Sequence, residues 1–386
     1  MALKVSARSE VPPFIVMEVM AAAAAREAGG GDVLHLEVGQ PNTPAPRLAR
    51  EAAVRAIGSE LLGYTLALGT PALRARIARY YQERHGIEVS PARIAVTAGS
   101  LGSFQLAFLA AFDAGDRVAM ANPGYPSYRN ALKPLGVEVV SLPVGPATHY
   151  HPTVAMVEEA GPLDGLIVAS PSNPTGSLLS RQRLVELARY CEARGIRLVS
   201  DEIYHGLTYG EPASSAIEVS ASAISINSFS KYYSMAGWRL GWMVMPEELV
   251  RPIERLAQNF FICPSSVAQA AALAAFESTD ELEGHVRRYR EARALLLEGL
   301  PRLGLTRFAP PDGAFYVYAD VSHLTGDSTA FCRRLLAETG IAATPGLDFD
   351  PVGGGATVRL SYARGPEVAA QALERLARWL PGRAGR

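Results

Sequence analysis

The sequence predicts an α/β protein with a large domain, built on a mostly parallel, doubly wound sheet covered by helices, and a smaller α+β domain formed by the two chain ends. Short β-rich runs alternate with longer helical patterns between residues 93 and 245, which is typical of βαβ units. Near residue 280 this alternation ends. With 386 residues, 48% of them hydrophobic, the chain is long enough for two such units. We expect the large domain at 46–285 and the small domain at 1–45 and 286–386.

The elements follow in order along the chain. The stretch "FIVMEVMAAAAAREA" (14–28) is interrupted by Glu18 and followed by "GGG", so it predicts an ordinary helix and not a signal peptide. Six strands of the large sheet are predicted at 93–97, 117–121, 165–170, 196–201, 223–228 and 240–245. A long charged helix (281–300), the strand-like "AFYVYADV" and "TVRLSYA", and two further helices then predict the smaller domain.

Composition excludes several classes of function. A formal net charge of −1 and a pI near 6.7 give no electrostatic basis for a nucleic-acid or anionic-membrane partner. The sequence contains no run of 18 or more apolar residues, so it predicts no membrane-spanning helix. Cys191, Cys263 and Cys332 are far apart, odd in number and without a CxxC pair. We therefore expect no disulfide framework and no metal site, and a reducing, cytoplasmic location.

Lysine is rare in this chain, and one lysine has an unusual setting. The 37 basic residues include only Lys4, Lys133 and Lys231 as lysines, which leaves 34 arginines. Positive charge alone is thus supplied by arginine, whereas an amine that acts as a nucleophile must be one of three residues. Lys4 lies near the terminus and Lys133 precedes Pro134 at the end of a helix. Lys231, in "SFSKYYSMAGWRLGW", is the candidate for chemistry.

Polar residues follow successive predicted strands. The carboxyl ends of parallel strands meet at one edge of a doubly wound sheet, where ligands bind. In chain order, the strands are followed by the small residues "AGSLGS" at a helix start, then Tyr125, Asn173, Asp201 with Tyr204, and Lys231. Each has a simpler interpretation as a helix cap, a packing residue or a turn. Their shared position at one edge favours a single ligand site.

This set of groups suits pyridoxal 5'-phosphate. The aldehyde of this cofactor requires an amine, its pyridine nitrogen a carboxylate, and its phenolic oxygen hydrogen-bond donors. Its flat ring stacks on an aromatic side chain, and its phosphate requires an anion site. The motifs "EVGQPNTP", "YTLALGTPALR", "VTAGS", "NPGYPSY", "SNPTG", "SDEIY", "SFSKYYSMAGWRLGW" and "VRLSYA" also resemble, in order and spacing, those of the class I and II aminotransferases of the aspartate aminotransferase superfamily, which have fold type I. The resemblance covers nearly the whole chain.

The resemblance implies a role for each residue around the cofactor ring. Lys231 would form the Schiff base and then move the proton from the substrate Cα. Asp201 would pair with the pyridine nitrogen. Tyr204 and Asn173 would bind the phenolic oxygen, and Tyr125 would stack on the ring. Lys231, Asp201 and Tyr204 are therefore the predicted catalytic residues.

The resemblance also implies which groups bind the phosphate. The backbone N–H groups of Ser100 and Leu101, the hydroxyl of Ser228 and the guanidinium of Arg239 would bind it. The residue matching Tyr64 reaches the phosphate of the neighbouring subunit in this family. A homodimer is therefore expected.

Substrate binding is assigned in the same way. Arg359 matches the family's carboxylate-binding arginine, Gly39 contributes a backbone N–H to the same carboxylate, and Asn173 belongs to both the cofactor and the substrate set. A bidentate guanidinium fixes the direction of the Cα–H bond. The segment "VPPFIV" (11–16), which lies over the substrate side chain in the family, is apolar. It favours neutral or aromatic amino acids, with their 2-oxo acids, over aspartate.

Two alternatives remain open at this point. Lyases and synthases of the same fold, such as C–S β-lyases, carry the same motifs. A non-catalytic, ligand-sensing aminotransferase-like domain is the other alternative, although no helix-turn-helix pattern precedes residue 35. A nicotinamide- or nucleotide-binding function is disfavoured because no GxGxxG follows the first strand and no GxxxxGK occurs.

Overall fold

The computed structural model describes residues 3–59 and 61–380. Its largest sheet has seven strands in the order β2-β8-β7-β6-β5-β3-β4. All are parallel except β8, which is antiparallel to both of its neighbours. The bounds are β2 Ile94–Thr97, β3 Arg117–Asn122, β4 Glu138–Pro143, β5 Gly165–Ala169, β6 Arg197–Asp201, β7 Ile224–Ser228 and β8 Gly241–Val244. The mostly parallel α/β fold is confirmed.

Six of these strands coincide with the predicted ones, and β4 was missed. Strand β4 lies at the edge of the sheet and pairs only with β3. Leu142 is its one fully buried residue, and the others are partly or fully exposed. An edge strand with little burial lacks the continuous apolar run or the regular alternation that marks a strand in sequence.

The sheet is covered on both faces because alternate residues of its strands point to opposite sides. In β5, Ile167 packs in one core with Phe104 and Phe108 of α4. Its neighbours Leu166 and Val168 pack in another core, with Leu187 of α7. The helices associated with this sheet are α3 Pro71–His85, α4 Gly99–Ala111, α5 Pro126–Leu132, α6 Val154–Glu159, α7 Arg181–Arg194, α8 Glu247–Phe260 and α9 Ser266–Ala275.

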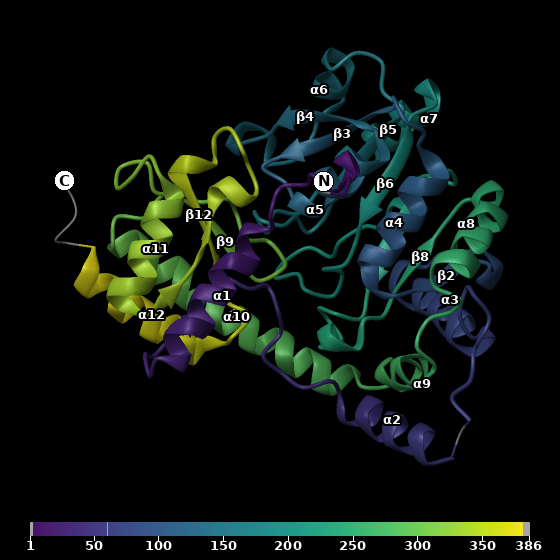
Figure 1. The fold of residues 1–386 in the computed structure, drawn as a ribbon, viewed down its shortest axis with the longest axis horizontal. Helices are drawn as coiled ribbons and strands as arrows, with labels where there is room; N and C mark the ends of the chain where they lie inside the picture. The colour runs from purple at the N-terminus through teal and green to yellow at the C-terminus, as the bar shows by residue number, and fades with distance from the viewer. Residues whose placement is uncertain (1–2, 60, 381–386) are drawn as a thin grey trace.

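The remaining elements, apart from α2 (Arg47–Ser59), form a second group, and α2 lies beside α9 (Figure 1). Strands β9 (Tyr316–Asp320), β11 (Thr344–Pro345) and β12 (Thr357–Ser361) make an antiparallel sheet in the order β11-β12-β9. Strand β1 (Leu34–His35) pairs with β10 (Ile341–Ala342). The helices outside the large sheet are α1 Ile15–Ala28, α2 Arg47–Ser59, α10 Thr279–Arg302, α11 Ser328–Thr339 and α12 Pro366–Trp379. The chain ends thus meet in this group, as expected for the smaller α+β part.

The two groups share a core. Figure 1 shows α10 running from beside α9 to the group of β9, β12, α11 and α12. One apolar cluster contains Trp242 of β8, Tyr80 of α3, Leu296 of α10 and Val358 of β12. The boundaries at 45/46 and 285/286 stay a prediction, and α10 crosses the second of them. Within the described residues, no helix is both long and apolar enough to cross a membrane.

Candidate active site

A cavity of about 200 Å³ lies where the carboxyl ends of β6 and β7 meet the start of α4 and the second group of elements. Ten of the twelve predicted site residues line this cavity: Gly39, Ser100, Leu101, Tyr125, Asn173, Asp201, Tyr204, Lys231, Arg239 and Arg359. Ser228 and Tyr64 are absent from its lining. Residues separated by up to 320 positions therefore meet in one place, as ligand binding beyond the strand ends requires.

Lys231 follows β7 closely and is only partly exposed. Its Nζ donates a hydrogen bond of 2.6 Å to the carbonyl oxygen of Gly39 and lies 5.7 Å from the ring centre of Tyr204. Burial, aided by the positive charges of Arg359 and Arg239 and opposed by Asp201, lowers the pKa of Lys231 to about 8. A substantial fraction of this amine is therefore neutral near physiological pH.

Asp201 ends β6 and is 4% exposed. Its carboxylate accepts hydrogen bonds from the Ile203 N–H, at 3.2 Å, and from the hydroxyl of Tyr128. Burial raises the pKa of Asp201 to about 6, although both hydrogen bonds act in the opposite direction. The carboxylate is thus buried near the amine without a cation in direct contact among the described residues.

Two functional candidates were missed in the sequence, and both are tyrosines that contact predicted residues. Tyr128 is the second tyrosine of "NPGYPSY" and bonds Asp201. Tyr316 of β9 places its hydroxyl 2.6 Å from that of Tyr204 and lines the cavity. Tyr128 could have been found from its place in the motif "NPGYPSY". Tyr316 could not, because the strand-like stretch "AFYVYADV" that contains it shows no sign of a functional role in the sequence.

Arg359 of β12 is 4% exposed. Its guanidinium donates to the side-chain oxygen of Asn173 at 2.8 Å and to the carbonyl oxygen of Glu37 at 2.5 Å. It also lies over two aromatic rings, 4.5 Å from the centre of Tyr316 and 4.7 Å from that of Phe349. Its Nε has no partner, and none of its hydrogen-bond partners within the described residues is a carboxylate. A buried guanidinium in this state is suited to bind a carboxylate.

The start of α4 forms a cradle with Arg239. Gly99 has φ +71°, and a Cβ at this position would lie 2.5 Å from Nη2 of Arg239, so only glycine lets the arginine approach the helix end. Arg239 itself has φ +53° and donates from Nη1 to the carbonyl oxygen of Ala236 at 2.9 Å. The N–H groups of Ser100 and Leu101 belong to the first turn of α4, where backbone donors lack partners within the helix. The cradle is suited to an anion.

Ser228 does not line the cavity. It is 1% exposed, and its hydroxyl lies 2.7 Å from that of Ser230 and donates to the carbonyl oxygen of Leu240 at 3.3 Å. Ser230 lines the cavity instead and was not singled out in the sequence. The two hydroxyls form a pair in which Ser230 is closer to the space that a ligand would occupy.

Part of the cavity lining is aromatic and apolar. The ring of Tyr125 packs edge-on against Tyr128 and Phe14, with ring centres 5.3 and 5.8 Å apart. Phe14 and three residues of α1, Val16, Met17 and Met20, also line the cavity. At Gly39 a Cβ would overlap the hydroxyl oxygen of Tyr316, so this position requires glycine because of the close approach.

Tyr64 is 83% exposed and lies apart from the cavity of its own chain. Leu61 and Leu66 beside it are also exposed. The contribution of Tyr64 to a neighbouring site therefore stays a prediction.

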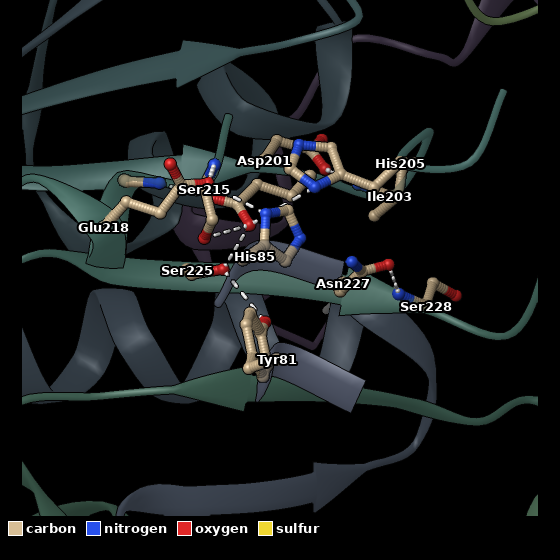
Figure 2. A network of polar contacts seen from close by, with 12 residues as sticks. Tyr81, His85, Asp201, Ile203, His205, Ser215, Glu218, Ser225, Asn227 and Ser228 are labelled. Carbon is tan, nitrogen blue, oxygen red and sulfur yellow. Dashed lines mark hydrogen bonds and ion pairs between the residues drawn. The ribbon is translucent and has the colours of Figure 1, made fainter. Parts of the chain in front are cut away.

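Behind Asp201 lies a buried polar network (Figure 2). Glu202 is 0% exposed, and its carboxylate accepts hydrogen bonds of 2.7 Å from the hydroxyls of Ser215 and Ser225 and of 2.8 Å from the Ala216 N–H. Figure 2 shows the rings of His85 and His205 close together beside the strand that carries Ser225, and their centres are 5.6 Å apart. The network joins β6 to β7 immediately behind the residue that faces the cavity.

The comparisons with known proteins agree with this geometry. Residues 31–376 match the family described as aminotransferase class I and II. The valine–pyruvate aminotransferase of Mycobacterium tuberculosis is 52% identical over 383 residues, covering 98% of this chain and 99% of the relative.

Solved structures are similar along the whole chain. A crystal structure of an aminotransferase from Mycobacterium tuberculosis has a TM-score of 0.97 at 51% identity, covering 99% of this chain and all of that one. The aspartate aminotransferase of Thermus thermophilus with maleate has a TM-score of 0.92 at 34% identity, covering 98% of this chain and all of that one. With its amine, buried carboxylate and buried guanidinium around one cavity, this chain belongs to the class I and II aminotransferases and is a transferase enzyme.

Proposed function

We propose that this aminotransferase uses pyridoxal 5'-phosphate, held through Lys231, to move the amino group of a neutral L-amino acid to a 2-oxo acid. The observation that carries the proposal is the meeting of Lys231, Asp201 and Arg359 in one cavity. An amine of lowered pKa, a buried carboxylate and a buried guanidinium are the three charged groups that this chemistry requires.

The residues fit the cofactor group by group. The cradle of Gly99, the first turn of α4 and Arg239 suits the phosphate. The pKa of Asp201 is raised by burial, and a nearby cation would stabilise its ionised form. A protonated pyridine nitrogen would provide that cation. Tyr125 offers an aromatic face to the ring, and Tyr204 a hydroxyl to its phenolic oxygen. When bound, the cofactor supplies an electron-accepting ring for the bonds at the substrate Cα.

Lys231 acts as the proton carrier. Its pKa of about 8 leaves part of the amine neutral at working pH. A neutral amine would accept the proton from the substrate Cα and deliver it to the cofactor carbon that carries the aldehyde. The carbonyl oxygen of Gly39, 2.6 Å from Nζ, accepts a hydrogen bond that holds the amine in the cavity. Arginine could not replace this lysine because its guanidinium stays protonated.

Arg359 and Asn173 bind and orient the substrate. The guanidinium fork matches a carboxylate in two-pronged geometry. The contact of 2.8 Å from Arg359 to the Asn173 oxygen fixes which way the amide points, so its NH₂ group faces away from the arginine. The bound carboxylate then sets the direction of the Cα–H bond relative to Lys231.

The side chain of the substrate would contact an apolar wall. Phe14, Val16, Met17 and Met20 line the cavity. The cations that line it within the described residues are Lys231, Arg239 and Arg359, and each already has a role. A second carboxylate would therefore lack a partner from this part of the chain. Together with the name of the relative that is 52% identical, this favours a branched neutral donor such as valine with pyruvate as acceptor.

We further propose that the enzyme is a homodimer in which Tyr64 contacts the phosphate of the neighbouring site. Its 83% exposure, beside exposed Leu61 and Leu66, leaves it available to a second chain. Sedimentation equilibrium should give twice the chain mass. Tyr64→Phe should weaken cofactor binding without dissociating the dimer, and an unchanged affinity would contradict the assignment of Tyr64.

The central test is reduction of the holoenzyme with borohydride followed by peptide mapping. We expect a pyridoxyl group on Lys231, none on Lys133, and no labelled peptide in Lys231→Ala. A protein that takes up no cofactor, or one labelled elsewhere, would overturn the role of Lys231.

A panel of amino donors and 2-oxo acids tests the substrate. Valine with pyruvate should give 3-methyl-2-oxobutanoate and alanine in equal amounts. A strong preference for aspartate or glutamate as donor would refute the neutral assignment, and release of ammonia in place of alanine would indicate a lyase.

A further inference from the structure

A second and larger cavity, of about 640 Å³, lies outside the active site and shares no lining residue with it. Its walls come from the segment before α6, from the start of α7, from residues 209–214, from α10, and from Asp312 before β9. Both groups of elements thus contribute to it. The proposed function assigns no role to this cavity.

Two arginines of the cavity lack an acidic partner. Arg183 of α7 donates from Nη1 to the carbonyl oxygen of Thr148 at 2.5 Å, and Arg293 of α10 donates from Nε to that of Pro311 at 2.6 Å. No carboxylate of the described residues pairs with either one. Because a guanidinium carries five N–H groups, each side chain is fixed by one contact and keeps donors for a ligand.

Two carboxylates, those of Asp312 and Glu211, also line this cavity. Oδ2 of Asp312 lies 2.7 Å from Nε2 of His149 and accepts a hydrogen bond of 3.1 Å from the Leu178 N–H. Among the described residues, neither carboxylate forms an ion pair with Arg183 or Arg293. The positive end of the α7 dipole adds to the field, because Ser180 caps this 14-residue helix at the cavity wall.

One residue of the lining has a buried polar atom without a partner. His151 lines the cavity, is 2% exposed, and its Nε2 has no hydrogen-bond partner among the described residues. Burial lowers the pKa of His151 to about 3, so the ring is neutral at physiological pH. Since a buried polar atom without a partner is costly, a polar group of a bound compound would stabilise it.

The rest of the wall offers apolar contacts. Leu179 and Tyr209 are 3% and 8% exposed and line the cavity together with Pro212. Arg293 also lies 5.3 Å from the ring centre of Tyr209, which keeps the guanidinium above an aromatic face. Such a wall suits the body of a compound whose charged end contacts the arginines.

We propose that this cavity is a second binding site for a small compound that carries a carboxylate or phosphate group on an apolar body. Arg183 and Arg293 bind the anionic group, His151 contacts a polar group of the compound, and Tyr209 packs against its body. Because Arg183 and Arg293 come from different groups of elements, a bound compound bridges them.

The test is to soak crystals of the holoenzyme in 4-bromobenzoate and to locate bromine from its anomalous signal. We expect a peak in the second cavity, whether or not a peak also occurs at Arg359. The double variant Arg183→Gln/Arg293→Gln should lose the cavity peak and retain its melting temperature within a few degrees. Arg189→Gln, on an exposed position of the same helix, should keep the peak.

Calorimetry on the same proteins in solution gives a second measurement. The double variant should bind 4-bromobenzoate in this cavity at least tenfold more weakly, whereas Arg189→Gln should not differ from the unaltered enzyme. Equal binding of the neutral 4-bromobenzyl alcohol, or no bromine in the cavity of the unaltered enzyme, would overturn the proposal. Displacement by inorganic phosphate at lower concentration than by acetate would assign the site to phosphoryl compounds, and the reverse to carboxylates.

Discussion

Asp201→Asn should stabilise the cofactor-free protein while it abolishes transamination. The carboxyl group of Asp201 is 4% exposed, and burial raises its pKa from an ordinary 3.8 to about 6. At 1.36 kcal/mol for each pH unit, this difference amounts to about 3 kcal/mol. Above pH 6 the folded apoprotein must keep an ionised carboxylate away from water, and among the described residues this carboxylate accepts hydrogen bonds only from Tyr128 and Ile203. An amide does not carry that charge.

The pH dependence gives the sign. Because the folded-state pKa of Asp201 is raised, folding takes up a proton between about pH 4 and pH 6, so the contribution of this residue is fully present below pH 4 and is lost as the pH rises through 6. The free energy of unfolding of Asp201→Asn minus that of the unaltered apoprotein should therefore grow by about 3 kcal/mol over this window. Lys231, with its pKa of about 8, titrates outside it.

Urea unfolding of both apoproteins at intervals from pH 4 to pH 8 measures this difference. Tyr128→Phe provides a change of opposite sign, because it removes a hydrogen bond to the carboxylate and should cost about 1.5–3 kcal/mol at pH 7. This cost should shrink when Asp201→Asn is also present. A difference between Asp201→Asn and the unaltered protein that stays constant with pH would refute the reasoning.

Three further predictions follow from the site. Gly39→Ala should lower kcat/KM by tenfold or more with the fold retained, because the new Cβ overlaps the Tyr316 hydroxyl and overpacking costs about 1–3 kcal/mol; unchanged steady-state kinetics would contradict this. In the apoprotein, the rate at which trinitrobenzenesulfonate labels Lys231 should rise with a half-point near pH 8, since burial and nearby arginines favour the neutral amine; a half-point near 10.5 would exclude this effect. Glu202→Gln should lower the free energy of unfolding by about 2 kcal/mol or more in urea, since a buried carboxylate with three donors loses charge-assisted hydrogen bonds. The exposed Glu291→Gln should have little effect, and equal costs for the two variants would show that the buried network adds no stability.

Much of the fold could be predicted because buried segments show a clear pattern of hydrophobic residues in the sequence. Strands β5 and β6 lie in the middle of the sheet and are buried on both faces along nearly their whole length, and β5 therefore forms a short apolar run in the sequence. The exposed edge strand β4 has no such hydrophobic pattern and was missed. Domain boundaries were harder to place, because α10 continues through the predicted boundary and its Leu296 packs in a core shared by both groups.

The candidate site could be predicted where a residue is of a rare type in this chain or directly ends a predicted strand. Lys231 is one of three lysines, and Asp201 directly ends a strand. Tyr128 and Tyr316 are two of 15 tyrosines, and only their hydrogen bonds to Asp201 and Tyr204 distinguish them. Which of two nearby serines faces the cavity, Ser228 or Ser230, also depends on side-chain direction.

By itself the sequence determined the α/β class, the order of the strand ends, and the amine of Lys231 and carboxylate of Asp201 that follow them, because local periodicity and strand-end position depend on neighbouring residues. The guanidinium of Arg359 was indicated by the family resemblance alone. Only the tertiary structure decided how these groups are tuned. The pKa of Lys231, the donors to Asp201, the two rings beside Arg359 and the presence of both Arg183 and Arg293 at a second cavity all arise from residues far apart in the chain. Such contacts are set by packing, which no local pattern of residues encodes.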